Sequence, residues 1–396
     1  MKILWHSNAP FSQTGYGNQT DIFSRALAKR GHEVIISSYW GQRGARLKSG
    51  DITILPGSHD DYGNDILETH YQVHQPDVFL ALMDVWVLNP TATQTIPLAA
   101  WTPVDHQPIP PATKTHLRAI RHPIAMSRFG ERMMRQAGFD PFYVPHAVET
   151  EVYKPLDEAG RADARKLWQV GDEKLFAITV AANKGTRKNL DRLLKAWARF
   201  VETHPDALLY IHSDPRPHMH GHDLEQLVEL YEIPRETVRF ADQYRLVMGD
   251  YGTERMNALY NAADVFVLPS AGEGFGIPII EAQAAGCPAI VTDFSSMSEL
   301  AANPDFLIAV DQDDLAATTQ GAEQALPKVS AIVAALEKAW QLKADPDRYD
   351  VARNVTRAFA LQYGIESVME RHMLPALECI AEINKSEREN HANTSA

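Results

Sequence analysis

Two glutamates, Glu273 and Glu281, stand eight residues apart in the stretch GEGFGIPIIE, among three glycines and one proline. The apolar run DVFVLPS (264–270) precedes this stretch, and IIEAQAAG (279–286) begins with helical character. The order predicts a strand, a glycine-rich turn and the start of a helix. Unpaired backbone N–H groups and the positive end of the helix dipole favour an anion such as a phosphate there.

The two carboxylates are expected to contact different parts of one extended ligand. Glu273 lies in the predicted loop, whereas Glu281 falls in the first turn of the predicted helix, where Pro278 also fits because its missing N–H needs no partner. A phosphate between two hydroxyl-bearing ends describes a nucleotide sugar. The alternative is that both glutamates are ordinary carboxylates near a helix start, each stabilising it by under ~1 kcal/mol.

A second candidate phosphate-binding segment follows the apolar run LFAITV (175–180). Lys184, Arg187 and Lys188 cluster there, before a helix predicted to begin near Asn189. Cations at a helix N-terminus oppose its dipole, so this placement is costly unless an anion lies between them. A diphosphate would supply that anion, and the alternative is a solvated basic turn.

The elements that position these residues alternate along the whole chain. Apolar runs followed by helix-like segments predict two doubly wound, mostly parallel sheets with ligands outside the carboxyl ends of the strands. The predicted strands are 2–7, 33–39, 77–83, 97–104, 122–127, 175–180, 207–213, 238–242, 264–270, 288–293 and 305–310. We expect an N-terminal domain, a second domain, helices that cross back to the first, and a flexible tail, at 1–165, 166–355, 356–384 and 385–396.

Composition narrows the class of protein. The 396 residues include 45% hydrophobic and 22% charged residues, which is typical of a globular protein of two domains. The formal charge of −13 disfavours wholesale binding to nucleic acid or to an anionic membrane. Two cysteines without metal-ligand spacing, no signal peptide and no apolar run near ~20 residues predict a cytoplasmic protein, soluble or at most peripheral.

The stretch PSAGEGFGIPIIEAQAAGCPAIVTD (269–293) resembles the E-x7-E signature of the retaining GT-B glycosyltransferases of family GT4. The resemblance implies an α/β fold of two Rossmann-like domains that face a central cleft. It also implies that Glu273 contacts hydroxyls of the donor sugar and that Glu281 holds the ribose. The backbone amides expected to line the sugar and phosphates are those of Gly274, Phe275, Gly276 and Ile277.

The same resemblance assigns the basic segment to the leaving nucleoside diphosphate. Lys188 and Arg187 are expected to neutralise it, although Ala181-Ala182 replaces the usual Gly-Arg and leaves open whether Lys184 supplies the second charge. In the opening SNAPFSQTGYG (7–17), Gly15 and Gly17 are expected to let the backbone approach a phosphate or the acceptor. A dinucleotide fingerprint fails here because Thr20 stands at the third glycine position.

The acceptor side is expected in the first domain. Asp105 and His106 follow the strand 97–104 in a proline-rich loop, and either could contact distal hydroxyls of the donor; the alternative is an ordinary loop pair. Residues 144–155 resemble the segment that ends the first domain of the family, with His146 and Ala147 replacing its Asn and Gly. Six basic residues (Lys114, Arg118, Arg121, Arg128, Arg132 and Arg135) could meet an anionic acceptor or form salt-bridged helix faces.

The sequence therefore predicts a retaining glycosyltransferase that moves a hexose-type sugar from a UDP or GDP donor to a hydroxyl. The resemblance implies that it uses no cofactor and requires no metal. Front-side attack is expected because no side chain is an evident nucleophile. The acceptor stays open among small molecules, lipid-linked sugars, proteins and modified nucleic acid, as does the oligomeric state; the alternatives are a sugar-nucleotide epimerase and a catalytically silent nucleotide-sugar-binding protein.

Overall fold

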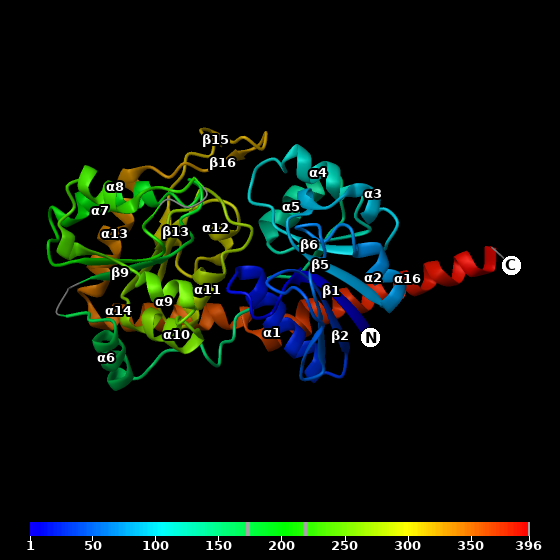
Figure 1. The fold of residues 1–396 in the computed structure, drawn as a ribbon. Coiled ribbons are helices and arrows are strands. Elements are labelled where there is room, and N and C mark those ends of the chain that lie inside the picture. The colour runs from blue at the N-terminus through cyan, green and yellow to red at the C-terminus, as the bar shows by residue number, and fades with distance from the viewer. Residues whose placement is uncertain (172–174, 217–219, 395–396) are drawn as a thin grey trace. The chain divides into compact units, whose positions relative to one another are not determined.

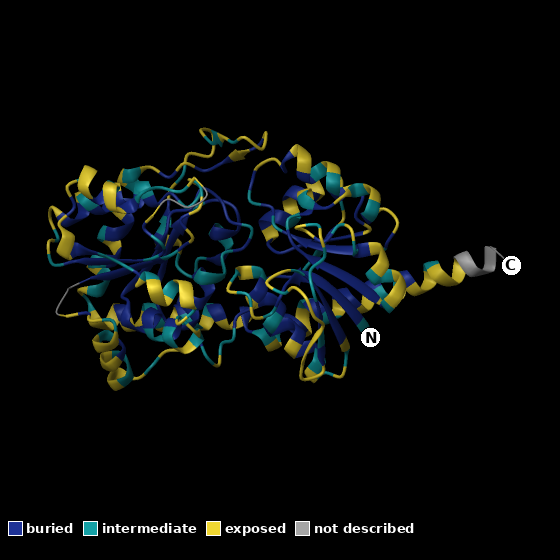
Figure 2. Cartoon of the chain, in the orientation of Figure 1, coloured by how far each residue is buried: buried dark blue, intermediate teal, exposed yellow. Residues whose placement is uncertain are grey.

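The computed structural model describes residues 1–171, 175–216 and 220–394. They form two compact units, which are described separately. Unit 1 contains Met1–Ala147, Thr318–Ala322 and the chain from Tyr363 onward, and unit 2 contains Val148–Ala317 and Glu323–Gln362. Figure 1 shows a sheet flanked by helices in each unit, and Figure 2 shows that the central strands of both sheets are buried.

Unit 1 is built on a sheet whose described strands have the order β3-β4-β2-β1-β5-β6-β7-β8. All its strand pairs are parallel except β3 with β4. Its central strands are almost wholly buried, which explains why they read as continuous apolar runs. The strands are β1 (Lys2–Asn8), β2 (Glu33–Trp40), β3 (Leu47–Ser49), β4 (Ile52–Leu55), β5 (Val78–Leu82), β6 (Leu98–Thr102), β7 (His122–Ala125) and β8 (Phe142–Tyr143).

The helices of unit 1 come from both ends of the chain. The last helix packs against β5 through Leu377 and Ile380, which are fully buried. The helices are α1 (Gly15–Lys29), α2 (Leu67–His74), α3 (Pro90–Thr93), α4 (Pro111–Leu117), α5 (Arg128–Gln136), α15 (Ile365–Val368) and α16 (Leu374–Thr394). A π-helical turn at Met369–Met373 joins the last two.

Unit 2 is built on a parallel sheet whose described strands have the order β11-β10-β9-β12-β13-β14. This is the doubly wound order of a Rossmann-type sheet. The strands are β9 (Phe176–Val180), β10 (Leu208–His212), β11 (Val238–Phe240), β12 (Val265–Leu268), β13 (Ala289–Thr292) and β14 (Leu307–Ile308). A separate antiparallel ribbon joins β15 (Ala316–Ala317) to β16 (Glu323–Gln324).

The helices of unit 2 surround that sheet (Figure 1). Helix α7 packs against α13, and the rings of Phe200 and Trp340 meet there with centroids 6.2 Å apart. The helices are α6 (Glu158–Leu167), α7 (Leu190–Val201), α8 (Leu224–Leu230), α9 (Gln243–Met248), α10 (Thr253–Ala262), α11 (Ile277–Ala284), α12 (Ser296–Leu300), α13 (Val329–Lys343) and α14 (Pro346–Ala360).

The predicted fold class is confirmed, since each predicted strand range overlaps an observed strand. Short strands β3, β4 and β8 were not predicted as strands, because a few residues in a turn-rich stretch give little periodic signal. Residues 148–165, expected in the first domain, cluster with unit 2. The polar stretch from Lys385 is helical as far as Thr394 rather than irregular, and the last two residues of the predicted tail lie outside the described residues.

The order of the strands explains where the site loops come together. In unit 2, chain connections leave in opposite directions from β9 and β12, which are neighbours in the sheet. In unit 1 the same reversal falls between β1 and β5. A crevice forms outside the carboxyl ends of the strands at such a point. The loops after β9 and β12 are therefore adjacent although they lie far apart in sequence.

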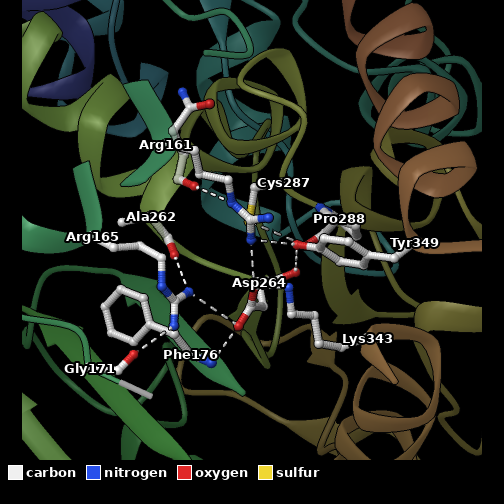
Figure 3. Close-up of polar contacts among 11 residues, drawn as sticks. Arg161, Arg165, Gly171, Phe176, Ala262, Asp264, Cys287, Pro288, Lys343 and Tyr349 are labelled. Carbon is white, nitrogen blue, oxygen red and sulfur yellow. Dashed lines mark hydrogen bonds and ion pairs between the residues drawn. The ribbon is translucent and has the colours of Figure 1, made fainter. Parts of the chain in front are cut away.

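A buried carboxylate joins β9 to β12 at the opposite, amino edge. Asp264 immediately precedes β12, and its Oδ2 accepts a hydrogen bond of 2.9 Å from the backbone N–H of Phe176, the first residue of β9. Three cations surround this fully buried side chain, with N–O distances of 2.6 Å from Arg161, 3.6 Å from Arg165 and 3.1 Å from Lys343 (Figure 3). One carboxylate thus fastens α6 and α13 to the sheet.

Replacing Asp264 with Asn tests this role. The amide keeps the shape of the side chain but leaves three largely buried cations without their counter-charge, so we expect the free energy of unfolding to fall by about 3 kcal/mol. Equilibrium urea unfolding followed by circular dichroism measures the change. The matched control is Asp163→Asn in α6, whose ion pair with Lys166 is 77% and 79% exposed and should contribute under about 1 kcal/mol. Equal effects of the two substitutions would contradict the assignment.

Candidate functional site

The loop after β12 ends at Gly276, a position that only glycine suits. Gly276 precedes α11 with φ of 114°, and a Cβ atom there would lie 2.7 Å from Cδ1 of Ile279. Pro278 is in the first turn of α11, as predicted. Glu281, predicted in that first turn, lies one turn further along, because the helix begins at Ile277. Its carboxylate therefore faces the interior of unit 2 rather than the helix N-terminus.

Two serines hold this loop in place. Ser295 Oγ accepts a hydrogen bond of 2.9 Å from the backbone N–H of Glu273. Ser296 Oγ lies 2.8 Å from the carbonyl oxygen of Glu273 and 2.5 Å from that of Phe275. Ser295 itself has φ of 55°, a conformation that non-glycine residues seldom adopt and that the surrounding contacts must maintain. The backbone that carries Glu273 is therefore fixed by its neighbours.

Glu273 forms an ion triad with the two cations that follow β9. Its Oε2 lies 2.8 Å from Nη1 of Arg187 and its Oε1 lies 2.5 Å from Nζ of Lys188. Burial alone would raise the pKa of this carboxyl, but Arg187 and then Lys188 outweigh it and lower the pKa to about 2. Glu273 is therefore fully ionised at neutral pH.

The triad changes how the basic segment is understood. The sequence suggested that an anion must lie beside these cations, and within the described residues that anion is the carboxylate of Glu273. Asn189 precedes α7 with φ of 50°, and its side-chain amide donates a hydrogen bond of 2.8 Å to the carbonyl oxygen of Pro269. Lys184, by contrast, is exposed, and its side chain makes no hydrogen bond or ion pair within the described residues. The structure thus brings Arg187 and Lys188 to Glu273 and leaves Lys184 apart.

Glu281 lies among tyrosines instead of cations. The hydroxyl of Tyr260 donates a hydrogen bond of 2.8 Å to its Oε2, and Tyr153 lies against the same carboxyl group. Burial raises the pKa of Glu281 to about 7, against the lowering effect of hydrogen bonds from Tyr260 and Tyr153. The two glutamates of one loop and helix therefore occupy separate surroundings, one cationic and one of neutral hydroxyl groups.

In unit 1, polar side chains gather outside the carboxyl ends of β1, β5 and β6. The hydroxyl of Tyr16 donates a hydrogen bond of 3.2 Å to Asp84, which follows β5. Burial raises the pKa of Tyr16, and the nearby charge of Asp84 raises it further. Asp105, after β6, lies 2.6 Å from Nδ1 of the buried His106. Asp105 and His106 are thus a bonded pair, with His106 oriented by its neighbour.

Gly15 and Gly17 do not lie in a loop, as predicted, but in the first turn of α1. The backbone N–H of Gly17 donates to Oγ1 of Thr14, which caps the helix. A Cβ atom on Gly17 would lie 2.1 Å from the carbonyl oxygen of Ser12, so local packing already requires this glycine.

The segment that ends unit 1 also serves packing. The ring of His146 packs on Trp101 at 4.5 Å between centroids, and burial lowers its pKa to about 3. The backbone N–H and carbonyl of Ala147 bond to the side chain of Gln19.

Several basic residues between Lys114 and Arg135 have acidic partners in unit 1. Arg128 and Arg135 both pair with Glu131, at 2.7 Å and 3.2 Å. Arg121 pairs with Glu387 of α16. These contacts fit the interpretation as salt-bridged helix faces.

Sequence reasoning missed the groups that support the predicted residues. Tyr153, Tyr260 and Asp84 sit in ordinary apolar or loop contexts, and nothing local marks them as partners of Glu281 or Tyr16. Ser295 and Ser296 follow the strand 288–293 at the same sheet edge, so the rule that ligand-binding loops follow strands could have singled them out.

Residues 1–171, 175–216 and 220–394 contain no group of three or more His, Cys, Asp or Glu side chains placed to hold a metal ion. Among the helices described in this structure, none combines the length and apolar character needed to cross a bilayer.

Two sheets of this topology, each with its polar groups at the carboxyl edge, define a protein of the GT-B fold. The structure matches that of a sucrose-phosphate synthase from Thermosynechococcus elongatus with a TM-score of 0.70 over 99% of this chain and 100% of that one, at 16% identity. It matches WaaG, a glycosyltransferase involved in lipopolysaccharide biosynthesis, with a TM-score of 0.67 over 96% and 99% of the chains, also at 16% identity.

One family match falls mostly on the sequence of unit 2. Residues 175–326 match the family described as Glycosyl transferases group 1. The chain is 32% identical over 126 residues to the D-inositol 3-phosphate glycosyltransferase of Corynebacterium urealyticum, covering 31% of this chain and 28% of that protein. It therefore spans under a third of that relative's length. The expected resemblance to GT4-type glycosyltransferases with the GT-B fold is confirmed.

Proposed function

We propose that the protein is a retaining glycosyltransferase that takes a hexose-type sugar from a UDP or GDP donor held by unit 2. The observation that carries this proposal is the convergence of Glu273, Arg187 and Lys188 at the switch point of the sheet, with Glu281 one helix turn inside α11. This arrangement offers cations for a diphosphate and carboxylates for hydroxyl groups on either side of it. The acceptor is an unidentified hydroxyl compound.

Each group has a chemical role in the proposal. Arg187 and Lys188 bind the diphosphate and stabilise the charge that grows on it as the glycosidic bond breaks. Glu273 then accepts hydrogen bonds from sugar hydroxyls, and Glu281 accepts them from the ribose. Asp105 and His106 are proposed to contact hydroxyl groups of the sugar.

The proposed reaction needs no nucleophile from the protein. The bond between the anomeric carbon and the donor phosphate breaks, and the acceptor oxygen forms its bond on the same face, so the configuration is retained. The proton of the acceptor hydroxyl passes to the leaving phosphate oxygen. The nucleoside diphosphate leaves neutralised by Lys188 and Arg187. Isolation of a covalent glycosyl-enzyme would overturn this mechanism.

Names of relatives support the class of donor. One relative is a GDP-mannose-dependent alpha-(1-6)-phosphatidylinositol monomannoside mannosyltransferase of Mycobacterium tuberculosis, 30% identical over 171 residues, which cover 41% of this chain and 40% of that protein. Its name states a sugar nucleotide as donor. For this chain the base and the sugar are to be found by experiment.

A panel of UDP-, GDP- and ADP-sugars tests the donor site by thermal stabilisation. A ligand that binds only the native state raises the unfolding temperature. We expect one nucleotide series to stabilise the wild type and to lose most of that effect in Glu281→Ala and in Lys188→Ala. Release of the free sugar or an epimerised donor without acceptor would point to a different reaction. The absence of any shift would overturn the proposal.

The ion triad predicts an unusual effect of Glu273→Gln. The diphosphate must replace the carboxylate of Glu273 as the partner of Arg187 and Lys188, so removing this charge should strengthen nucleoside diphosphate binding while abolishing sugar transfer. We expect about a tenfold gain in affinity, or ~1.4 kcal/mol, measured by calorimetry.

The matched control for that experiment is Glu229→Gln, which removes one negative charge from a residue that is 72% exposed in unit 2. It should leave both affinity and transfer unchanged. Weaker diphosphate binding by Glu273→Gln would show that Glu273 supports the phosphate site instead of competing with the ligand.

The raised pKa of Glu281 predicts a pH dependence of donor binding. A protonated carboxyl accepts hydrogen bonds from ribose hydroxyls poorly, so below a pKa of about 7 binding must first expel a proton. The affinity for a sugar nucleotide should fall about tenfold from pH 8 to pH 6. Glu281→Gln should bind more weakly and without this slope, since its amide does not titrate. The same slope in both proteins would assign the titration to another group.

A further inference from the structure

Unit 1 contains a second cavity that the proposed reaction does not use. Its volume is about 490 Å³, within the range of roughly 300–1,000 Å³ typical of small-molecule sites. Helices α2 and α16, which lie side by side in Figure 1, form part of its wall through Tyr71 and Asn384. The segments that lead into β6 and β7 complete it, at residues 93–97 and 118–121.

The cavity lies at the edge of the sheet opposite to Asp105 and His106. Ile96 and Pro97 precede β6 and Arg121 precedes β7, so the cavity is at the amino ends of these parallel strands. Asp105 and His106 follow β6 at its carboxyl end. The five residues of β6 separate the two places by about 16 Å at 3.3 Å per residue.

Three arginines line this cavity, and one carboxylate faces them. Arg121 pairs with Glu387. Arg388 donates a hydrogen bond of 2.6 Å to the carbonyl oxygen of Pro76, which occupies one of its five N–H donors. The side chain of Arg118 makes no hydrogen bond or ion pair with any residue of the described chain. The walls thus carry a net charge of about +2 with free guanidinium donors, in a protein whose formal charge is −13.

The three arginines are exposed, so water and salt screen their mutual repulsion, and an anion bound between them would remove what is left of it. Guanidinium groups bind the oxygens of a phosphate group in a bidentate manner. Threonine and amide side chains in the same wall can bind hydroxyl groups of the ligand. Gln94 supplies such a side chain here, whereas the hydroxyl of Thr95 donates to the carbonyl oxygen of Ala92 and the amide of Asn384 is bonded to His122 and Asp77.

We propose that this cavity binds the phosphate group of a small phosphorylated ligand, through Arg118 and Arg388, at a site separate from the donor site of unit 2. The phosphate can belong to a soluble metabolite or to a lipid headgroup, and both would make the same contacts. Because α16 supplies Asn384, Glu387 and Arg388, a bound phosphate also ties the last helix to the amino edge of the sheet.

Pyrophosphate titration by calorimetry tests this site in the full chain. Pyrophosphate should also bind the donor site, so the Lys188→Ala variant serves as background. We expect this variant to keep one saturable site. Adding Arg118→Gln should lower the affinity of that site for pyrophosphate at least tenfold. Adding Lys114→Gln instead should change the affinity for pyrophosphate less than twofold, because Lys114 lies four residues from Arg118 and does not line the cavity. Arg388→Gln should repeat the loss.

The outcomes separate this proposal from the proposed function. Pyrophosphate binding that Arg118→Gln leaves intact in the Lys188→Ala background, or no binding in that background, would overturn the second site. Unaltered pyrophosphate stoichiometry and affinity in Lys188→Ala alone would instead contradict the donor site. Adding Arg118→Gln should leave the unfolding temperature of the Lys188→Ala background unchanged, since Arg118 makes no hydrogen bond or ion pair within the described residues.

The source of the phosphate is resolved by two further arms. The first measures the binding of glucose 6-phosphate by Arg118→Gln and Lys114→Gln. The second measures the sedimentation of the same two variants with phosphatidylglycerol vesicles and with phosphatidylcholine vesicles. Arg118-dependent binding of the sugar phosphate identifies a soluble ligand, and Arg118-dependent sedimentation with phosphatidylglycerol identifies a lipid. Failure of both arms together with pyrophosphate would overturn the proposal.

Discussion

The contact between β9 and β12 is the constraint on which unit 2 depends. The two strands pair only through a short ladder, yet a buried carboxylate fastens them at each end. Asp264 bonds the start of β9 at the amino edge, and Glu273 holds the cations that follow β9 at the carboxyl edge. Both carboxylates come from segments that flank β12. A buried charge tolerates removal of its partners poorly, so these two ends fix the relative position of the strands and of the loops they carry.

The two glutamates of the motif show how surroundings divide the roles of identical side chains. Both are buried, but cations lower the pKa of Glu273 to about 2, whereas tyrosine hydroxyls leave burial dominant and raise that of Glu281 to about 7. Surroundings that shift the pKa values of two acids in opposite directions are common at functional sites. The difference comes from the loop after β9 on one side and from α10 on the other. The residues of the motif alone do not produce this difference in pKa.

The sequence predicted the parts of this protein that depend on local order. Buried parallel strands are continuous apolar runs, and glycine and proline mark the turn into α11, so the fold class and the loop that carries Glu273 could be identified. Pairing across distant segments could not. No pattern near Arg187 indicates that its counter-ion is Glu273, and none near Tyr260 indicates that it bonds Glu281. The prediction for Gly17 was wrong because glycine suits both a ligand-binding loop and a tightly packed helix start. The reason for glycine here is the nearby carbonyl oxygen of Ser12, which the sequence does not reveal.

The hydrogen bond from Phe176 to Asp264 joins residues 88 positions apart in the chain. Closing a loop of that length costs chain entropy before any of the surrounding contacts form, and contacts of large sequence separation slow folding. The segment between them already contains β10 and β11 with their helices, which can dock on β9 first. The crevice depends on the pairing of β12 with β9, so its geometry is set by a contact between segments that lie far apart in the chain.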